Sequence, residues 1–126
     1  MAEPARATVL LVEDDDDNRE LMTEVLQGSG YAVVAVATGA AALRSLAERR
    51  VDAVVTDFGM PGIGGLDVAR AAKTVDPRVP VIVVTGYSER DDISDARGRE
   101  VDAVLVKPID PDWLVASIAR VIAKRR

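Results

Sequence analysis

Residues 53–61 read AVVTDFGMP, an apolar run of small and β-branched side chains that stops at the acid Asp57. A run without polar alternation is typical of a strand that is buried on both faces of a sheet. Four other short apolar runs of the same kind lie at residues 9–12, 31–37, 81–84 and 103–106. The five segments together predict five buried strands.

The segments between these runs have the spacing of amphipathic helices. The first apolar face comprises Leu21, Met22, Val25 and Leu26, and its helix is expected to end at Gly28 or Gly30. Further apolar faces lie at residues 43–47, after Thr38-Gly39, and at residues 66–72, after Gly64-Gly65. These segments predict the first three helices.

Two more helices are predicted in the second half of the chain. Ser88 and Asp91 fit a capping box, but residues 88–100 offer few apolar anchors, so this helix is expected to be weakly held. The last helix is expected to start at Asp110-Pro111, because Asp is a good N-cap and Pro suits the first helical position.

Strands that alternate with helices favour a parallel sheet covered by helices on both faces. Right-handed crossovers and five strands favour the order 2-1-3-4-5, in which the first and third strands are neighbours. The sequence therefore predicts an α/β class fold.

The composition limits the functions that this chain can have. The 126 residues are 48% apolar and 29% charged, which predicts one domain at residues 8–126 after a short tail at residues 1–7. A net charge of −5 disfavours direct nucleic-acid binding. Without Cys and His, imidazole and thiolate chemistry are excluded. No segment resembles a signal peptide or a membrane span, so a cytoplasmic location without membrane contact is expected.

The strand ends predict the functional site. In open α/β sheets the ligand site lies beyond the carboxyl ends of the strands, where Glu13, Asp14, Asp57, Thr85 and Lys107 stand. Clustered carboxylates repel one another unless a cation or a proton joins them. An all-oxygen ligand set with open positions favours Mg²⁺, and Lys107 adds a charge for a phosphoryl oxygen.

The chain resembles the receiver domains of two-component response regulators over residues 8–126. The resemblance rests on four motifs that follow predicted strands: Glu13-Asp14, Asp57-Phe58-Gly59-Met60-Pro61 with Gly65 beyond it, Thr85-Gly86 and Lys107-Pro108. It implies a flavodoxin-like (βα)5 three-layer sandwich. It also implies a signalling domain rather than an enzyme, which receives a phosphoryl group from a sensor histidine kinase or a histidine phosphotransfer protein and then changes its contacts with an unknown downstream protein.

The resemblance also implies a role for each site residue. Asp57 would be the phosphoacceptor, and Thr85 and Lys107 would hold the phosphoryl group. Mg²⁺ would be bound by Asp14, Asp57 and the Gly59 carbonyl, with Glu13 nearby or acting through water. The bond between Lys107 and Pro108 is expected to be cis.

Some positions depart from the family pattern. Val104 stands where receivers commonly have Tyr or Phe, so the coupling of Thr85 to the rest of the domain is expected to differ. Gly59 and Tyr87 occupy positions that tune phosphoryl lifetime in this family. Residues 88–100 mix basic and acidic side chains, which is compatible with a homodimer without requiring one.

Simpler interpretations apply to several of these residues. Asp16 and Asp17 are interpreted as a helix start, with Asp17 and Glu20 as a capping box. Trp113 is interpreted as a packing residue, with a partner-facing role as the alternative. For the whole chain, the alternatives are a degenerate receiver that only binds partners, a phosphatase with an aspartyl nucleophile and, from the fold alone, a flavin-binding protein.

Overall fold

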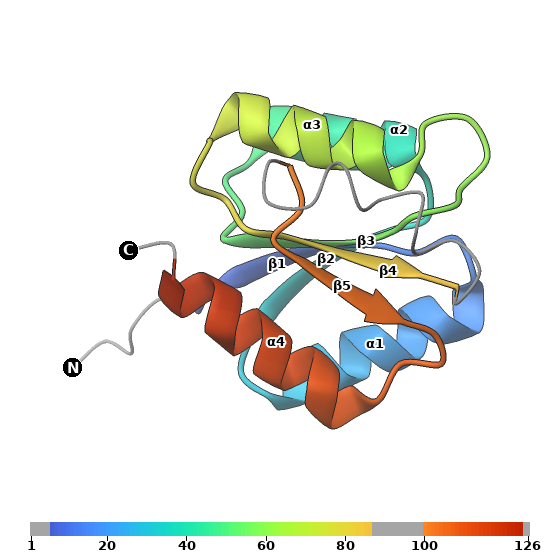
Figure 1. Ribbon diagram of the computed structural model, residues 1–126, viewed down its shortest axis with the longest axis vertical. Helices are drawn as coiled ribbons and strands as arrows, with labels where there is room; N and C mark the ends of the chain where they lie inside the picture. The colour runs from blue at the N-terminus through green and yellow to red at the C-terminus, as the bar shows by residue number, and fades with distance from the viewer. Residues whose placement is uncertain (1–5, 87–99, 125–126) are drawn as a thin grey trace.

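The computed structural model describes residues 6–86 and 100–124. Its centre is a parallel sheet in the order β2-β1-β3-β4-β5 (Figure 1), which confirms the predicted order and the flavodoxin-like class. The strands are β1 Thr8–Val12, β2 Ala32–Val36, β3 Ala53–Asp57, β4 Val81–Thr85 and β5 Ala103–Val106.

Helices cover both faces of this sheet and make three layers (Figure 1). One face carries α1, Asp16–Gly28, and α4, Pro111–Lys124, while the other carries α2, Gly39–Glu48, and α3, Gly65–Val75. The helix predicted at residues 88–100, with its capping box, lies almost wholly outside the described residues, as does Tyr87. Of the predicted tail, residues 6 and 7 are described and precede β1.

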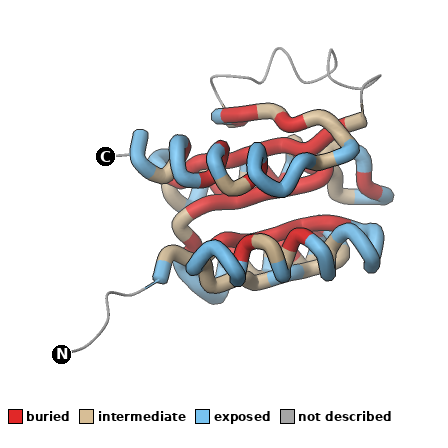
Figure 2. The backbone as a smooth tube through the Cα atoms, turned by 90° about the horizontal axis from the view of Figure 1, so that it is seen from below, coloured by how far each residue is buried: buried red, intermediate tan, exposed pale blue. Residues whose placement is uncertain are grey.

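The strands separate two apolar cores because alternate side chains point to opposite faces. Leu10, Val54 and Val83 pack with α2 and α3, whereas Leu11 and Val55 belong to the core under α1 and α4. Figure 2 shows this arrangement as buried strands between helices whose outer sides are exposed. The uninterrupted apolar runs are thereby explained, since both faces of the central strands are covered.

Capping residues set three of the helix starts. The Thr38 hydroxyl accepts from the Ala41 amide at 3.1 Å, a cap that was not predicted from the sequence. An Asp110 carboxylate oxygen accepts from the Asp112 amide at 2.9 Å, as the sequence predicts for the last helix. The N-cap of α1, however, is Asp15, so the predicted Asp17 capping box is wrong. The helix starts earlier because α1 follows β1 after a turn of only three residues.

Two exposed apolar side chains also correct the predictions. Leu21 is 53% exposed, so it does not belong to the buried face of α1 that Met22 and Leu26 form. Trp113 is 46% exposed at the start of α4, so the interpretation as a packing residue is not supported. Within residues 6–86 and 100–124, no helix has the length and apolar character that crossing a membrane requires.

Candidate functional site

The strand register brings the predicted acids together. Val12 of β1 lies opposite Thr56 of β3, so Glu13 and Asp57 both stand one residue beyond the same pair. Glu13 is 2% exposed and Asp57 is 5% exposed, whereas Asp14 is open to solvent. Ligand atoms of the three carboxylates all lie within 4.8 Å of one another. The predicted acidic cluster is therefore present at the carboxyl end of the sheet.

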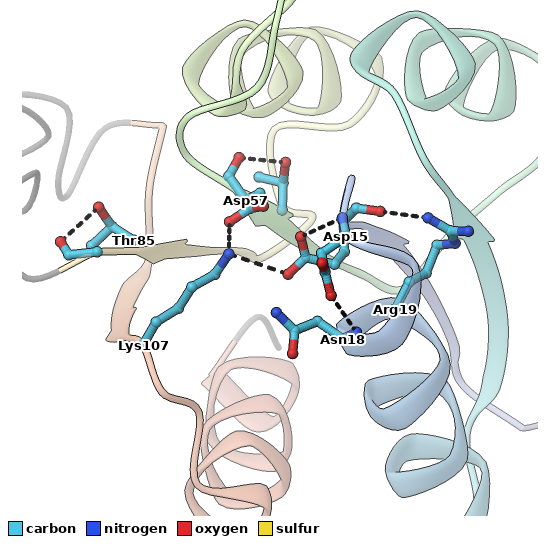
Figure 3. A network of polar contacts seen from close by, with 9 residues as sticks. Asp15, Asn18, Arg19, Asp57, Thr85 and Lys107 are labelled. Carbon is cyan, nitrogen blue, oxygen red and sulfur yellow. Dashed lines mark hydrogen bonds and ion pairs between the residues drawn. The ribbon is translucent and has the colours of Figure 1, made fainter.

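Lys107 lies between the two buried carboxylates. Its Nζ is 2.8 Å from Asp57 Oδ1 and 3.3 Å from Glu13 Oε1, as the dashed lines in Figure 3 show. Lys107 directly follows β5, and its amide donates to the Thr85 carbonyl at 2.8 Å. The peptide bond to Pro108 is cis, as expected. One ammonium group thus contacts two carboxyl groups that are both removed from water.

The surroundings of Asp57 raise the pKa of its carboxyl from 3.8 to about 8. Burial is the main cause, since it penalises the charged form, and a hydrogen bond with Glu13 adds to it. Lys107 acts in the opposite direction because it stabilises the carboxylate. Asp57 therefore binds its proton far more tightly than an ordinary aspartate does.

Two opposing effects act on Lys107. Burial lowers the pKa of the ammonium group, but the hydrogen bond and the attraction of Asp57, together with Glu13, raise it above its ordinary value of 10.5. Lys107 consequently stays charged at neutral pH. The single positive charge of Lys107 faces three acids, namely the buried Glu13 and Asp57 and the exposed Asp14. The charge of the cluster therefore favours the binding of a further cation.

The donor atoms of the cluster are suited to a hard cation. Carboxylate oxygens are the ligands that Mg²⁺ prefers, and Mg²⁺ usually keeps several waters and a phosphate in its coordination shell. Asp14 offers an exposed carboxylate beside the buried Asp57. These residues fit a magnesium site that remains open towards solvent on one side.

The loop after β3 is anchored in the core. Met60 is buried, and Phe58 packs against the same core under α2 and α3. The Phe58 amide donates to the Val84 carbonyl at 2.8 Å, and the Gly65 amide donates to the Phe58 carbonyl at 2.9 Å. Gly59 lies between these anchored residues, two positions beyond Asp57. The role of its carbonyl as a metal ligand stays a prediction.

Gly65 permits the close approach of α3 to Asp57. A methyl group there would overlap the backbone carbonyl of Asp57 and lie 2.9 Å from the Phe58 Cα. We expect Gly65→Ala to destabilise the protein by about 1–3 kcal/mol, because backbone must move. Gly28→Ala should be neutral or stabilising, because an added methyl group at this helical position would meet no atom within 4 Å apart from its chain neighbours and the backbone of its own helix. Urea unfolding of both variants checks this, and equal stabilities would contradict it.

The Thr85 side chain lies apart from the ion pairs of Lys107, although its carbonyl accepts from the Lys107 amide. Its hydroxyl donates to the Gly86 carbonyl at 3.2 Å, and in Figure 3 the residue lies to one side of the acids. Alternation explains this, because Thr85 shares a strand face with Val83, whereas Asp57 shares the opposite face with Val55. The structure therefore places Thr85 at the same edge of the sheet but outside the acidic cluster.

Val104 is the residue that departs from the family pattern. It is partly buried in β5 and packs against the core under α2 and α3. Val104 pairs in register with Val83 of β4, so the two side chains lie on the same face of the sheet. Tyr87 falls outside the described residues, so its expected effect on phosphoryl lifetime stays a prediction.

Sequence reasoning missed Asn18 and Arg19, which lie beside the acids in Figure 3. The backbone amide of Asn18 donates to Asp15 Oδ2 at 2.8 Å, and Arg19 Nη1 donates to the Glu13 carbonyl at 3.0 Å. The one available signal was the i,i+3 spacing of Asp16 and Arg19, which is typical of ordinary helix surfaces. Nothing in that spacing indicates a contact with the end of β1.

The fold and the strand-end site together define a signalling domain of the CheY-like class. A family model described as the response regulator receiver domain matches residues 9–119. The chain therefore belongs to the response regulator receiver domain family of two-component signalling. The curated relatives MtrA and PrrA are both named as regulators.

Curated relatives from mycobacteria match nearly the whole chain. The DNA-binding response regulator MtrA of Mycolicibacterium smegmatis is 33% identical over 113 residues, covering 90% of this chain and 49% of MtrA. The transcriptional regulatory protein PrrA of Mycobacterium tuberculosis is 38% identical over 117 residues, covering 93% of this chain and 50% of PrrA. The chain thus spans about half the length of these relatives. That this domain avoids nucleic acid stays a prediction.

Solved receiver structures have the same fold. A response regulator receiver domain protein from Clostridium thermocellum superimposes with a TM-score of 0.89 at 26% identity, covering 94% of this chain and 96% of that one. The response regulator TrrA of Thermotoga maritima, solved in complex with Mg²⁺-BeF, has a TM-score of 0.81 at 32% identity, covering 91% and 98%. Both match more than nine-tenths of this chain.

Proposed function

We propose that this chain is a phosphoacceptor switch, in which Asp57 takes a phosphoryl group from a phosphohistidine on a histidine kinase or a phosphotransfer protein. The observation that carries this proposal is the Lys107 ammonium group 2.8 Å from a buried aspartate, beside two further acids. A nucleophilic carboxylate, an oxygen-ligand cluster and a cation are the components that phosphoryl transfer to a carboxylate requires.

In the proposed step, a carboxylate oxygen of Asp57 attacks the phosphorus atom. The new oxygen–phosphorus bond forms as the nitrogen–phosphorus bond breaks, and the electron pair leaves with the partner's imidazole, which takes up a proton. Asp14, Asp57 and the Gly59 carbonyl would hold Mg²⁺, with Glu13 nearby or through water. Mg²⁺ would supply positive charge that offsets the phosphoryl oxygens.

In this proposal, Lys107 changes its partner when Asp57 is phosphorylated. In the described structure its ammonium group pairs with Asp57 and Glu13. When Asp57 carries a phosphoryl group, Lys107 would instead donate to a phosphoryl oxygen, and the Thr85 hydroxyl would turn towards another. The loss of the Lys107–Asp57 pair would then bias the contacts of the domain with its downstream partner.

An apolar hollow beside the acceptor supports a protein as the phosphodonor. The hollow has a volume of about 430 Å³ and is lined by α1 and by the segment from Lys107 to Leu114. The exposed Leu21 lines it together with Ile109, and so does Glu13 of the acidic cluster. A helix that inserts an apolar side chain there would bring its own histidine close to Asp57.

Intact mass after incubation with acetyl phosphate tests this function. We expect a single phosphoryl adduct that requires Mg²⁺ and is absent from Asp57→Asn. Asp67→Asn is a suitable control, because this exposed acid lies in the first turn of α3, accepts from the Gly64 amide and is not a member of the acidic cluster. No adduct would favour a domain that only binds partners, and repeated turnover of a small phosphate ester would favour a phosphatase.

A further inference from the structure

The turn between β1 and α1 carries Glu13 and Asp14, and side chains tie it to the first turn of the helix. The Asp15 amide donates to Glu13 Oε2 at 3.2 Å, and the Asn18 amide donates to Asp15 Oδ2 at 2.8 Å. Both contacts hold residues that flank Asp14. The exposed Asp14 carboxylate therefore depends on its neighbours for its direction.

Arg19 contacts the peptide group that precedes Asp14 along the backbone. Its Nη1 donates to the Glu13 carbonyl at 3.0 Å (Figure 3). Its Nη2 lies 2.6 Å from Asp16 Oδ1. The Glu13 carbonyl belongs to the planar peptide group that joins Glu13 to Asp14. A fixed carbonyl prevents this plane from rotating, and so the backbone on both sides of it keeps its direction.

We propose that Arg19 is a positioning residue for cation binding, which orients the peptide between Glu13 and Asp14 so that both carboxylates face Asp57. This inference rests on the proposed function, because Mg²⁺ is the cation concerned. The Arg19 side chain is three-quarters buried. Its planar guanidinium group pairs with the Asp16 carboxylate and donates to the Glu13 carbonyl at the same time. Such a group defines one geometry of the turn.

Electrostatics alone predicts the opposite effect. A guanidinium group beside a cation site repels the cation, so removing its charge should strengthen Mg²⁺ binding. If Arg19 acts by positioning, removing it should weaken Mg²⁺ binding despite the lost repulsion. The sign of the change therefore separates the two roles.

Isothermal titration with MgCl₂ on Arg19→Ala and Arg19→Lys provides the test. We expect Arg19→Ala to raise the Mg²⁺ Kd by about 3- to 10-fold, below the effect of removing a partner that contacts a ligand side chain directly. Arg19→Lys keeps the charge but not the fork, so its Kd should lie between those of Arg19→Ala and the parent. Hydrogen exchange without Mg²⁺ should show less protection of the Asp15 amide in Arg19→Ala.

The matched control is Arg70→Ala. Arg70 also sits on a helix and pairs with an acid, Glu100, at 3.3 Å, but on α3. Its removal should leave the Mg²⁺ Kd unchanged, and circular dichroism checks that all variants are folded.

The outcomes are distinct. An unchanged or lower Kd in Arg19→Ala, with the parent binding Mg²⁺, overturns the positioning role and leaves the proposed function standing. A parent chain that binds no Mg²⁺ overturns both. A higher Kd in Arg19→Ala with partial recovery in Arg19→Lys supports the positioning role.

Discussion

Asp57→Asn is expected to be more stable than the parent chain at pH 8 in the absence of Mg²⁺, by about 1–3 kcal/mol. The parent must keep an acid group buried beside Glu13, which raises the pKa of Asp57 to about 8. Each unit of pKa difference between the folded and unfolded chain corresponds to about 1.4 kcal/mol. The variant loses the ion pair with Lys107, which offsets much of the gain.

The pH dependence of this difference follows from the direction of the shift. Below about pH 4, position 57 of the parent is protonated in both the folded and the unfolded chain. As the pH rises to about 8, the unfolded chain releases this proton while the folded chain retains it. The stability of the parent relative to the variant therefore falls across this window and levels off above it.

Urea unfolding between pH 4.5 and 8.5 in the presence of a chelator, at intervals of about one pH unit, measures this difference. Glu24→Gln is the control, because Glu24 is exposed on α1. The gap between Asp57→Asn and the parent should widen with pH, while the gap for Glu24→Gln should stay nearly constant. A gap for Asp57→Asn that is constant or narrows with rising pH would show that Asp57 does not retain its proton.

Lys107→Ala is expected to lower the free energy of unfolding by about 2–4 kcal/mol at pH 8.5, because it leaves two buried carboxylates without their cation. The side chain of Lys107 is 32% exposed, and the two acids are almost fully buried. The loss should be smaller at pH 5.5, where Asp57 holds its proton. Formation of the phosphoryl adduct should slow by about 100-fold, as when one oxyanion donor is removed.

Lys73→Ala provides a closely matched control at the opposite end of the sheet. Lys73 Nζ lies 2.8 Å from Asp102 Oδ2 and donates to the Val79 carbonyl at 2.6 Å. Its removal should also cost stability but leave adduct formation unchanged. If both variants slowed adduct formation equally, the effect of Lys107 would be one of folding. If Lys107→Ala formed the adduct at the parental rate, Lys107 would have no part in phosphoryl transfer.

The prediction of the fold succeeded because its signal is local. Each central strand is covered on both faces, so burial requires an unbroken apolar run, and five such runs are visible in the chain. The connections then leave few topologies, since crossovers between parallel strands are right-handed. The end of each run also locates Glu13, Asp57, Thr85 and Lys107, because the residue after a buried strand lies at the edge of the sheet.

The details that sequence reasoning missed depend on contacts between elements. Asp15, Asp16 and Asp17 are all suitable N-caps by residue type, and the spacing to Glu20 favoured Asp17, but the short turn after β1 selects Asp15. Leu21 has the helical spacing of a core residue, yet it lies beside the hollow near the acids.

For the acidic site too, the sequence determines some features and the tertiary structure determines others. Its residue types follow from the pattern along the chain, since each acid, hydroxyl or amine directly follows an apolar run. The relations between these residues come from folding, because the parallel register places Glu13 beside Asp57 and brings Lys107 across from β5. Burial of Asp57 then raises the pKa of its carboxyl, an effect that depends on how much water the surrounding helices exclude.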